Sequence, residues 1–494
     1  MVAATSYPLG ILMILLITSF VMPILKGVKP VKGLALSSIL LCLLLSVLTL
    51  VYVNQQEPFI YRVGHFDAPW GIELKIGFLE ALMAVVFTAI TTLITWASFY
   101  SIDHEVKAKR IRLYYSLCSI LLAGLLGIVF SNDIFNCFVF IELSSIAACG
   151  IVVIKDKKEN IKAGLKYLIL SSLGSGLVLM GIAFLYSVTG QLNIDFIHQE
   201  LISVKDMYHK TLIISLGLFT VGLGVKSAMF PLHVWLPDAH THAPSTSSAL
   251  LSALVLKAYI LLFIKIIYRV FGIEIVRTLS VLEIVMITGA AGMIYGSVLA
   301  LMQKDFKRMI AYSSVAQIGY IFFGIGLGNA LGLAAAIFHI INHAMTKAAL
   351  FLTAGSIIER IQSKEINKLR GIGIEMPLTL GIFAVCALSM VGIPLFAGFN
   401  SKWNFALAII DSDKIIFTAV LIASSLLNAL YYLPIVINAY FGEENVKDRV
   451  YMSKEKPIGK LMPMMILAFI IIYLGVSSNG IMSLITKSIS GFNM

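Results

Sequence analysis

Charged residues are scarce in this sequence. Asp, Glu, Lys and Arg make up only 13% of its 494 residues, whereas 59% are apolar. An average water-soluble domain contains about 25% charged residues, so the scarcity excludes an ordinary soluble protein. With a mean hydropathy of +0.94, the composition is typical of a protein that is integral to a membrane.

Cysteine is also rare, and no C-x-x-C pair occurs in the sequence. The five residues lie in apolar runs, where a thiol packs as a small apolar group: Cys42, Cys118, Cys137, Cys149 and Cys386. This spacing gives little support to a disulfide framework, a haem or an iron–sulfur cluster. We expect no cofactor and no bound metal in this chain.

The first apolar run lacks the features of a cleaved signal peptide. No basic residue precedes it and no A-x-A-like cleavage site follows it, so we expect a retained helix. Runs of about 20 apolar residues, the length that crosses a bilayer, continue along the chain without a soluble domain between them. The fourteen predicted spans are Tyr7–Leu25, Gly33–Val53, Ile76–Tyr100, Ile111–Phe130, Ile134–Ile154, Ala163–Val188, Thr211–Trp235, Ser245–Val270, Leu279–Met302, Met309–Gly328, Leu331–Ile357, Pro377–Ile410, Ile415–Tyr440 and Leu461–Val476.

Basic residues are unevenly distributed around these spans. Most of the 37 Lys and Arg residues fall in six polar segments that follow alternate spans, including those with Lys307 and Lys460, whereas the opposite set, which includes Lys265, holds few. Cytoplasmic loops of membrane proteins carry the excess of basic residues. We therefore predict that these six segments are cytoplasmic and that both termini lie outside. The net charge of +11 then reflects orientation in a membrane rather than binding of nucleic acid.

Four lysines lie inside predicted spans: Lys226, Lys257, Lys347 and Lys402. A lysine at mid-membrane costs between ~3 kcal/mol on insertion scales and ~10 kcal/mol or more in simulations of isolated helices. Such residues face the interior of a helix bundle or a hydrated path. The four lysines are therefore candidates for a functional site.

One carboxylate, Glu142, belongs with these lysines because it also lies in a predicted span. In a Glu142–Lys226 pair, the proton affinity of each group would depend on the geometry of the pair, as a gated proton carrier requires. The alternative is a static buried ion pair that fixes helix register. Lys257 and Lys402 have no equally evident carboxylate partner, which favours titration over permanent pairing.

Proline interrupts the first lysine-bearing span, in the stretch "GVKSAMFPLHVWLPDAH". Pro231 has no N–H for the carbonyl of Ser227 and its ring clashes there, so we predict a helix break just after Lys226. Carbonyls freed at membrane depth are tolerated only against protein or water. The break therefore predicts a polar pocket around the lysine.

A second interruption has the same form. Gly392 and Pro394 break the apolar run before Lys402, and Pro394 frees the carbonyl of Met390. Two proline-broken helices, each with a lysine, suggest the internal repeats that are typical of transporters.

A polar stripe lies between these two sites. His339, His343 and Lys347 follow an i, i+4, i+8 pattern and share one helical face. Histidine binds and releases protons near neutral pH, so the stripe is a candidate link between Lys257 and Lys402. The alternatives are two satisfied core histidines and an H-x3-H metal pair, although no nearby carboxylate or cysteine completes such a site.

Two other segments contain polar or glycine residues that we do not interpret as metal or nucleotide sites. We interpret the loop after Pro231 as an interfacial loop or a proton entrance rather than a metal site; its polar residues are His233, Asp238, His240 and His242. "GIGLGNALG" at 324–332 is interpreted as glycine that packs helices, not as a nucleotide fingerprint.

Long motifs in this chain resemble those of one known family. They are "FNCFVFIELSS", "KSAMFPLHVWLPDAHTHAPSTSSALLSALVLK", "KDFKRMIAYSSVAQIGY", "FHIINHAMTKAALFLTAG" and "VGIPLFAGFNSKW". Across nearly its whole length the chain resembles the proton-translocating, antiporter-like subunits shared by respiratory complex I, membrane-bound hydrogenases and the multisubunit Mrp sodium/proton antiporters.

The resemblance implies an all-α integral membrane protein of about fourteen transmembrane helices. Helices 4–8 and 9–13 would form two inverted five-helix repeats, each with a broken helix, 7 in the first and 12 in the second. Helices 1–3 would occupy residues 1–110, the repeats 111–271 and 279–440, and the C-terminal loop with helix 14 residues 441–494.

The resemblance also assigns roles in proton translocation to six residues. Glu142 matches the glutamate of helix 5, Lys226 the lysine of broken helix 7, and Lys257 the lysine of helix 8. His339 and His343 would line the central axis in helix 11. Lys402 would be the terminal lysine of broken helix 12.

Within the family, the chain looks most like the D-type component of Mrp antiporters or its counterpart in Mrp-containing hydrogenases. Members that resemble the middle pump of complex I have glutamate in place of Lys402, and the largest members continue into a lateral helix that this sequence lacks. The smallest complex I pump is the next candidate.

The resemblance further implies a subunit that moves protons, with Na⁺ as the second candidate ion, among other membrane subunits in a prokaryotic cell membrane. No redox or hydrolytic site is expected in this chain, so any redox reaction would belong to its partners. One alternative is a structural subunit that only docks its neighbours. Another is a stand-alone carrier of an organic solute, which ranks last because the spans hold no Arg or Asn cluster for a carboxylate substrate.

Overall fold

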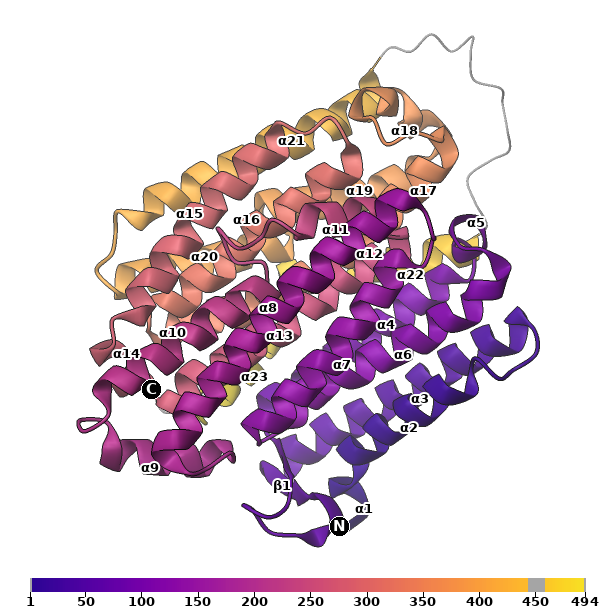
Figure 1. Ribbon diagram of the computed structural model, residues 1–494. Helices are drawn as coiled ribbons and strands as arrows, with labels where there is room; N and C mark the ends of the chain where they lie inside the picture. Colours follow the sequence, from indigo (N-terminus) through magenta and orange to yellow (C-terminus); the bar gives the residue numbers. More distant parts are fainter. Residues whose placement is uncertain (1, 443–457, 493–494) are drawn as a thin grey trace.

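Long helices follow one another through the computed structural model, which describes residues 2–442 and 458–492 (Figure 1). The α-helices are α1 (Val2–Thr5), α2 (Tyr7–Val21), α3 (Val28–Gln55), α4 (Phe78–Ser98), α5 (Ile102–Glu105), α6 (Ala108–Phe130), α7 (Ile134–Val153), α8 (Lys158–Thr189), α9 (Ile194–Val204), α10 (His209–Lys226), α11 (Leu236–His242), α12 (Ser245–Leu250), α13 (Leu256–Lys265), α14 (Ile273–Thr278), α15 (Val281–Leu301), α16 (Phe306–Gly326), α17 (Ala330–Ile361), α18 (Ile372–Glu375), α19 (Pro377–Val391), α20 (Ala397–Asp411), α21 (Phe417–Phe441), α22 (Ile458–Val476) and α23 (Asn479–Ile489). Short 3₁₀ turns are η1 (Val63–His65) and η4 (Ile366–Leu369), and π-helical turns are η2 (Leu251–Val255) and η3 (Ile266–Phe271).

Each of the fourteen predicted spans contains a helix, so the predicted all-α membrane architecture is confirmed. Eleven helices in the described part of the chain are long and apolar enough to cross a membrane, with α12 to η3 counted as one, and α2 and α19 are shorter apolar helices. The structure adds a small antiparallel ribbon of β1 (Phe59–Arg62) and β2 (Glu73–Ile76), in which Phe59 pairs with Ile76. The repeat boundaries at 111–271 and 279–440 stay a prediction.

The centre of the bundle is formed by two helices, the continuous Ser245–Phe271 helix and α17. Their apolar stretches are buried along their whole length, whereas only a third of the corresponding stretch of α3 or α21 is buried. In Figure 1, α12 and α17 lie between the purple helices of the first half and the orange helices of the second. Polar residues on these two helices therefore lie inside protein, where they can be solvated by other side chains.

The break predicted after Lys226 is confirmed. Helix α10 ends at Lys226, and Ala228 follows in the left-handed region with φ 57°. The carbonyl of Val225 loses its helical partner and accepts a hydrogen bond from Trp235 Nε1 at 2.8 Å. The freed backbone group is thus satisfied inside the protein, as the membrane environment requires.

The second predicted break is confirmed as well. Helix α19 ends at Val391, and Gly392 with φ 90° and Leu395 with φ 76° turn the chain into α20. A positive φ costs least at glycine because it has no Cβ. The interruption leaves the last carbonyls of α19 without helical donors and brings α20 close to them.

Some basic residues lie elsewhere than the sequence predicts. Lys265, Lys307 and Lys460 were assigned to polar segments at the membrane surface, but each is only 2% exposed and lies inside the bundle. The residues sit near helix ends, and composition alone does not show which end is covered by a neighbouring helix. The predicted basic segment that contains Lys447, Arg449, Lys454 and Lys456 lies outside the described residues.

Glycines bring α15 and α16 into close contact. A Cβ on Gly326 of α16 would lie 2.4 Å from the backbone nitrogen of Met286, and one on Gly289 of α15 would lie 2.4 Å from that of Phe323. A Cβ on Gly324 would lie 2.5 Å from the Phe405 ring of α20. Small residues allow such close approach of helix backbones in membranes. The interpretation of this segment as packing glycine is confirmed.

We therefore expect Gly326→Leu to separate α15 from α16 and to lower the free energy of unfolding by about 3 kcal/mol. The yield of folded protein after detergent extraction and size-exclusion chromatography would measure the effect. Gly217→Leu is the matched control, because no atom lies within 4 Å of a Cβ built on Gly217. Equal losses in both variants would contradict the packing role.

Candidate functional site

Lys226 lies at the end of α10 and is buried against α7 and α8. Its ammonium group donates hydrogen bonds to Ser145 Oγ at 2.6 Å and to Ser171 Oγ at 2.7 Å. It also lies 5.7 Å from the centre of the Tyr259 ring, within the range of a cation–π contact. These neutral acceptors solvate the ammonium group without neutralising its charge.

The predicted Glu142–Lys226 contact is present but long. Glu142 Oε1 lies 3.8 Å from Lys226 Nζ, whereas a direct charge-assisted hydrogen bond measures about 2.7–2.9 Å. The Glu142 side chain is 36% exposed on α7, and Val139 and Ile146 beside it are exposed apolar residues. Within the described residues, Glu142 Oε1 has no hydrogen-bond partner. The Glu142 side chain therefore lies at the surface of the bundle, with its Oε1 atom buried on the side of the lysine.

Lys257 is fully buried in the central Ser245–Phe271 helix. Its ammonium group donates to the carbonyl of Ser252, which belongs to the π-helical turn η2. A π-helical turn disturbs the i→i−4 hydrogen-bond ladder of an α-helix, and such turns are frequent at functional sites. The irregular turn thus supplies a carbonyl acceptor to the lysine of the same helix.

Lys347 lies on α17 and contacts α16. Its ammonium group donates to the carbonyl of Ile310 at 2.8 Å and to Ser313 Oγ at 2.5 Å. Lys257 is an electrostatic neighbour of Lys347, so the two central helices each bring an ammonium group to the same region.

The predicted histidine stripe is buried along α17. The rings of His339 and His343 stack with centres 5.9 Å apart, and His339 Nδ1 lies 2.7 Å from Ser401 Oγ of α20. His343 has Lys257 and Lys347 as electrostatic neighbours, and His339 has Lys402. The stripe therefore extends from the region of Lys257 to the helix that carries Lys402.

Lys402 is held by the end of the broken helix before it. Its ammonium group donates to the carbonyls of Met390 at 3.0 Å and Val391 at 2.8 Å. The centre of the Tyr320 ring lies 5.2 Å away. The carbonyl that Pro394 was predicted to free is thus an acceptor for this lysine.

Three of the buried lysines lack an acidic partner. Within residues 2–442 and 458–492, no Asp or Glu forms an ion pair with Lys257, Lys347 or Lys402. Burying a charge without a counter-ion is unfavourable, and carbonyl and hydroxyl dipoles offset only part of that free energy. These three lysines therefore differ from the members of a static ion pair.

Sequence reasoning missed His240 as a member of this central group. The predicted interfacial position is wrong for His240, which is fully buried on α11 and stacks on Phe351 with ring centres 5.1 Å apart. Within the described residues, neither of its ring nitrogens has a hydrogen-bond partner. Its electrostatic neighbours are Lys257, Lys307 and Lys347. No helical spacing relates His240 to these lysines, so the sequence carries no signal of their proximity.

Asp238 lies in the same loop as His240, but its side chain is partly exposed. Its carboxylate binds Lys166 at 2.6 Å and Arg308 at 3.4 Å and stays partly exposed. A cavity of about 260 Å³ opens beside this pair and is lined by Glu159, Lys162, Lys166, Asp238 and His242. Asp238 and His242 therefore line a solvent-accessible cavity, in agreement with the prediction of an interfacial loop after Pro231.

A second polar group lies where α5 meets the start of α12. Glu105 Oε1 accepts a hydrogen bond from the backbone nitrogen of Ser245 at 3.0 Å and pairs with Lys155. Burial alone would raise the pKa of Glu105, but the ammonium groups of Lys155 and Lys307 outweigh it and lower the pKa to about 2. The carboxylate is therefore a fixed negative charge at neutral pH.

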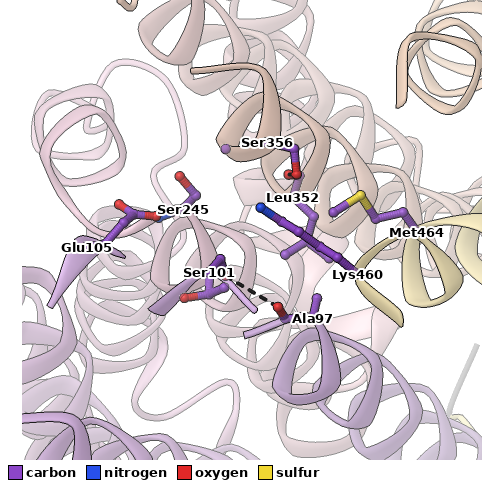
Figure 2. A pocket seen from close by; sticks show the side chains of 10 residues that line it. Ala97, Ser101, Glu105, Ser245, Leu352, Ser356, Lys460 and Met464 are labelled. Atoms are coloured by element: carbon purple, nitrogen blue, oxygen red, sulfur yellow. Dashed lines mark hydrogen bonds between the residues drawn. The ribbon is translucent and has the colours of Figure 1, made fainter. Parts of the chain in front are cut away.

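A cavity of about 10 Å³, the size of one water molecule, adjoins Glu105. Figure 2 shows Lys460 of α22 pointing toward the side of this cavity on which Ser245 and Glu105 lie. The Lys460 ammonium group binds Glu359 Oε2 at 2.7 Å. None of the six predicted site residues lines this cavity.

A multi-pass helix bundle with two interrupted helices and a buried line of lysines and histidines defines a membrane protein of the transporter class. The chain belongs to the NADH:quinone oxidoreductase/Mrp antiporter transmembrane family, whose model matches residues 131–428. The matched segment contains every site residue named in the sequence analysis, from Glu142 to Lys402. The predicted family is thereby confirmed.

Known relatives come from two kinds of complex. The chain is 35% identical over 440 residues to the N-type component of the NADH-quinone oxidoreductase of Desulforudis audaxviator (strain MP104C), and the match covers 86% of each protein. It is 29% identical to the D-type component of the Na⁺/H⁺ antiporter of Alkalihalophilus pseudofirmus, covering 89% of this chain and 87% of the relative. A chain in the structure of the Mrp complex from Dietzia sp. DQ12-45-1b superposes with a TM-score of 0.90 at 23% identity, over 100% of this chain and 98% of that one, and has the same fold.

The lowered pKa of Glu105 leads to a pH-dependent prediction. We expect Glu105→Gln to lower the free energy of unfolding by about 2 kcal/mol at neutral pH, because it removes a charged acceptor. A folded-state pKa below the ordinary 4.5 stabilises the protein above pH 4.5, and this stabilisation is lost as the pH falls toward 2. The difference from wild type should therefore narrow in that interval when thermal unfolding is followed in detergent.

Glu365→Gln is the control for Glu105→Gln. Glu365 forms only an exposed i, i+3 contact with Lys368 at 3.7 Å, and exposed pairs of this kind contribute little to stability. A loss of stability in Glu105→Gln that stays constant from neutral pH to pH 3 would show that the carboxylate charge is not its cause.

Proposed function

We propose that this chain is the proton-translocating subunit of an Mrp-type cation/proton antiporter or of a related redox-driven complex. Protons load Lys226 from one side of the membrane and pass Lys257 and the histidine stripe. Lys402 releases them to the other side. The two broken helices form the inner ends of two offset half-channels.

The observation that carries this proposal is the row of buried ammonium groups without acidic partners. Lys257, Lys347 and Lys402 are solvated by carbonyls, hydroxyls and an aromatic ring, so both their charged and neutral forms have partners. His343 and His339 lie between them and are able to accept and donate protons. A row of ammonium groups repels Na⁺, which supports the proton as the ion that moves here.

Glu142 supplies the proposed control of loading. Its carboxylate lies at the surface of the bundle, 3.8 Å from Lys226. A neighbouring subunit that moves Glu142 closer would stabilise the charged lysine, and one that moves it away would favour proton release. A partly exposed carboxylate in a membrane-spanning helix also needs protein or water beside it, which supports a partner subunit at this face.

His240 extends the proposed path toward the polar segments that we predict to be cytoplasmic. It links Lys307, which donates to the carbonyl of Ala243 at 2.5 Å, to Lys257 and Lys347. We infer that protons reach the central lysines through this group. The chain would then lie in a prokaryotic cell membrane with both termini outside, among other membrane subunits of the complex.

Removal of the loading lysine tests the proposal directly. We expect Lys226→Ala to abolish ion transport, at least about 100-fold, while the complex still assembles, because no other group at the first break takes the proton. Proton uptake by membrane vesicles that contain the complex measures transport, and co-purification of the other subunits measures assembly. Lys210→Ala is the control, since Lys210 is exposed at the start of the same helix.

A structural subunit that only docks its neighbours is the rival function. The loose Glu142–Lys226 pair and the unpaired lysines disfavour it, because a docking role gains nothing from buried unpaired charge. Lys257→Met and Lys402→Met distinguish the two functions. We expect an assembled complex without proton transport in both variants, and impaired assembly with proportionate transport would support docking.

A further inference from the structure

Helix α21 has a polar face that the predicted path does not use. Only a third of its apolar stretch is buried, yet Ser424, Asn428 and Tyr432 are fully buried and Tyr431 nearly so. These residues follow i, i+4, i+7 and i+8 and therefore point to one side. The side chains at Ile422 and Leu426 on the other side are exposed. The polar face is thus directed at the centre of the protein.

Asn428 shares an acceptor with Lys402. The carbonyl of Met390 accepts from Lys402 Nζ at 3.0 Å and from Asn428 Nδ2 at 3.4 Å. This carbonyl lies at the interrupted end of α19, where it has no helical donor. The two side chains therefore satisfy the same freed backbone group.

Tyr431 determines how the Asn428 amide is oriented. Its phenol donates a hydrogen bond to Asn428 Oδ1, so the amide nitrogen is the atom directed at Met390. A donor on the amide oxygen also polarises the amide and strengthens the hydrogen bond that its nitrogen donates. Tyr431 thus supports the contact between Asn428 and the carbonyl.

The same cluster extends to the second central lysine. The Tyr431 ring lies 4.7 Å from that of Tyr432, and Tyr432 OH lies 2.8 Å from Ser313 Oγ. Ser313 Oγ in turn accepts from Lys347 at 2.5 Å. The polar face of α21 therefore touches the surroundings of both Lys347 and Lys402 without passing through the histidines.

We infer that Asn428, oriented by Tyr431, is a positioning residue that sets how tightly Lys402 holds its proton. The inference rests on the proposed function of Lys402 and adds a residue to it. When Lys402 is neutral, Asn428 still donates to the Met390 carbonyl, so the broken helix end stays satisfied after proton release. Without Asn428, the carbonyl relies on Lys402, and the charged ammonium form is a stronger donor than the neutral amine. Proton release from Lys402 therefore becomes less favourable.

Other ionisable groups around Lys402 are few. In the part of the chain that the structure describes, the titratable side chains that neighbour Lys402 are Tyr320 of α16 and His339 of α17. Helices α19 and α21 contain no charged residue, and the one charged residue of α22, Lys460, pairs with Glu359. A change at Asn428 therefore acts on Lys402 mainly through the shared carbonyl.

The test uses Asn428→Leu and Tyr431→Phe in the assembled complex in membrane vesicles, with proton transport measured as a function of pH. We expect the pH of half-maximal transport to rise by about one unit in Asn428→Leu and by about half a unit in Tyr431→Phe. The sign follows because a lysine that holds its proton more tightly releases it only at higher pH. Tyr440→Phe removes a phenol hydroxyl near the end of the same helix, where it binds the carbonyl of Pro377 at 3.2 Å, and should leave the profile unchanged.

An unshifted or acid-shifted profile in Tyr431→Phe would overturn the inference, and this variant decides alone if Asn428→Leu fails to assemble. Lys402→Met distinguishes a failure of the positioning role of Asn428 from a failure of the proposed function of Lys402. If it abolishes transport and the Tyr431→Phe profile is unshifted, only the positioning role fails. If Lys402→Met transports normally, the proposed function of Lys402 fails.

Discussion

The architecture depends on keeping several ammonium groups inside a membrane protein without neutralising them. Each needs oxygen acceptors where water is scarce, and the fold supplies them by interrupting its own helices. Lys402 binds the carbonyls at the end of α19, and Lys257 binds a carbonyl of a π-helical turn. Lys226, at a break whose carbonyls are already satisfied, uses two serines instead. Helix irregularity therefore supplies the acceptors of Lys402 and Lys257, whereas serine hydroxyls supply those of Lys226.

The carboxylates of the protein are arranged differently from its buried lysines. Glu80 is held in a short, buried ion pair with Arg269, and Glu105 in a short, partly exposed pair with Lys155. Glu142 approaches the buried Lys226 from the outer surface of the bundle, at the longer distance of 3.8 Å. Paired charges thus lie near the ends of the helices, whereas the lysines in the middle of the bundle are solvated by neutral groups, which the proposed proton path requires. Ion pairs thus stabilise the helix bundle at positions separate from the lysines at its centre.

Relatives from a respiratory enzyme and from an antiporter are both similar over most of the chain. The buried lysines bind side-chain and backbone groups of this chain. A similar scaffold is therefore found in more than one kind of complex. Under the proposed function, the driving reaction belongs to the neighbouring subunits.

The sequence by itself determined the membrane class, the fourteen spans, the two helix breaks and the lysines at them, because hydrophobic length, proline chemistry and the free energy of buried charge are local properties. It also determined the face shared by His339 and His343, which follows from helical spacing. Only the tertiary structure decided that His240 joins Lys257 and Lys347, that Lys307 and Lys460 are buried, and that Asn428 meets Lys402 at one carbonyl. Those contacts join residues far apart in the chain, and the packing of helices around α17, rather than any local pattern, brings them together.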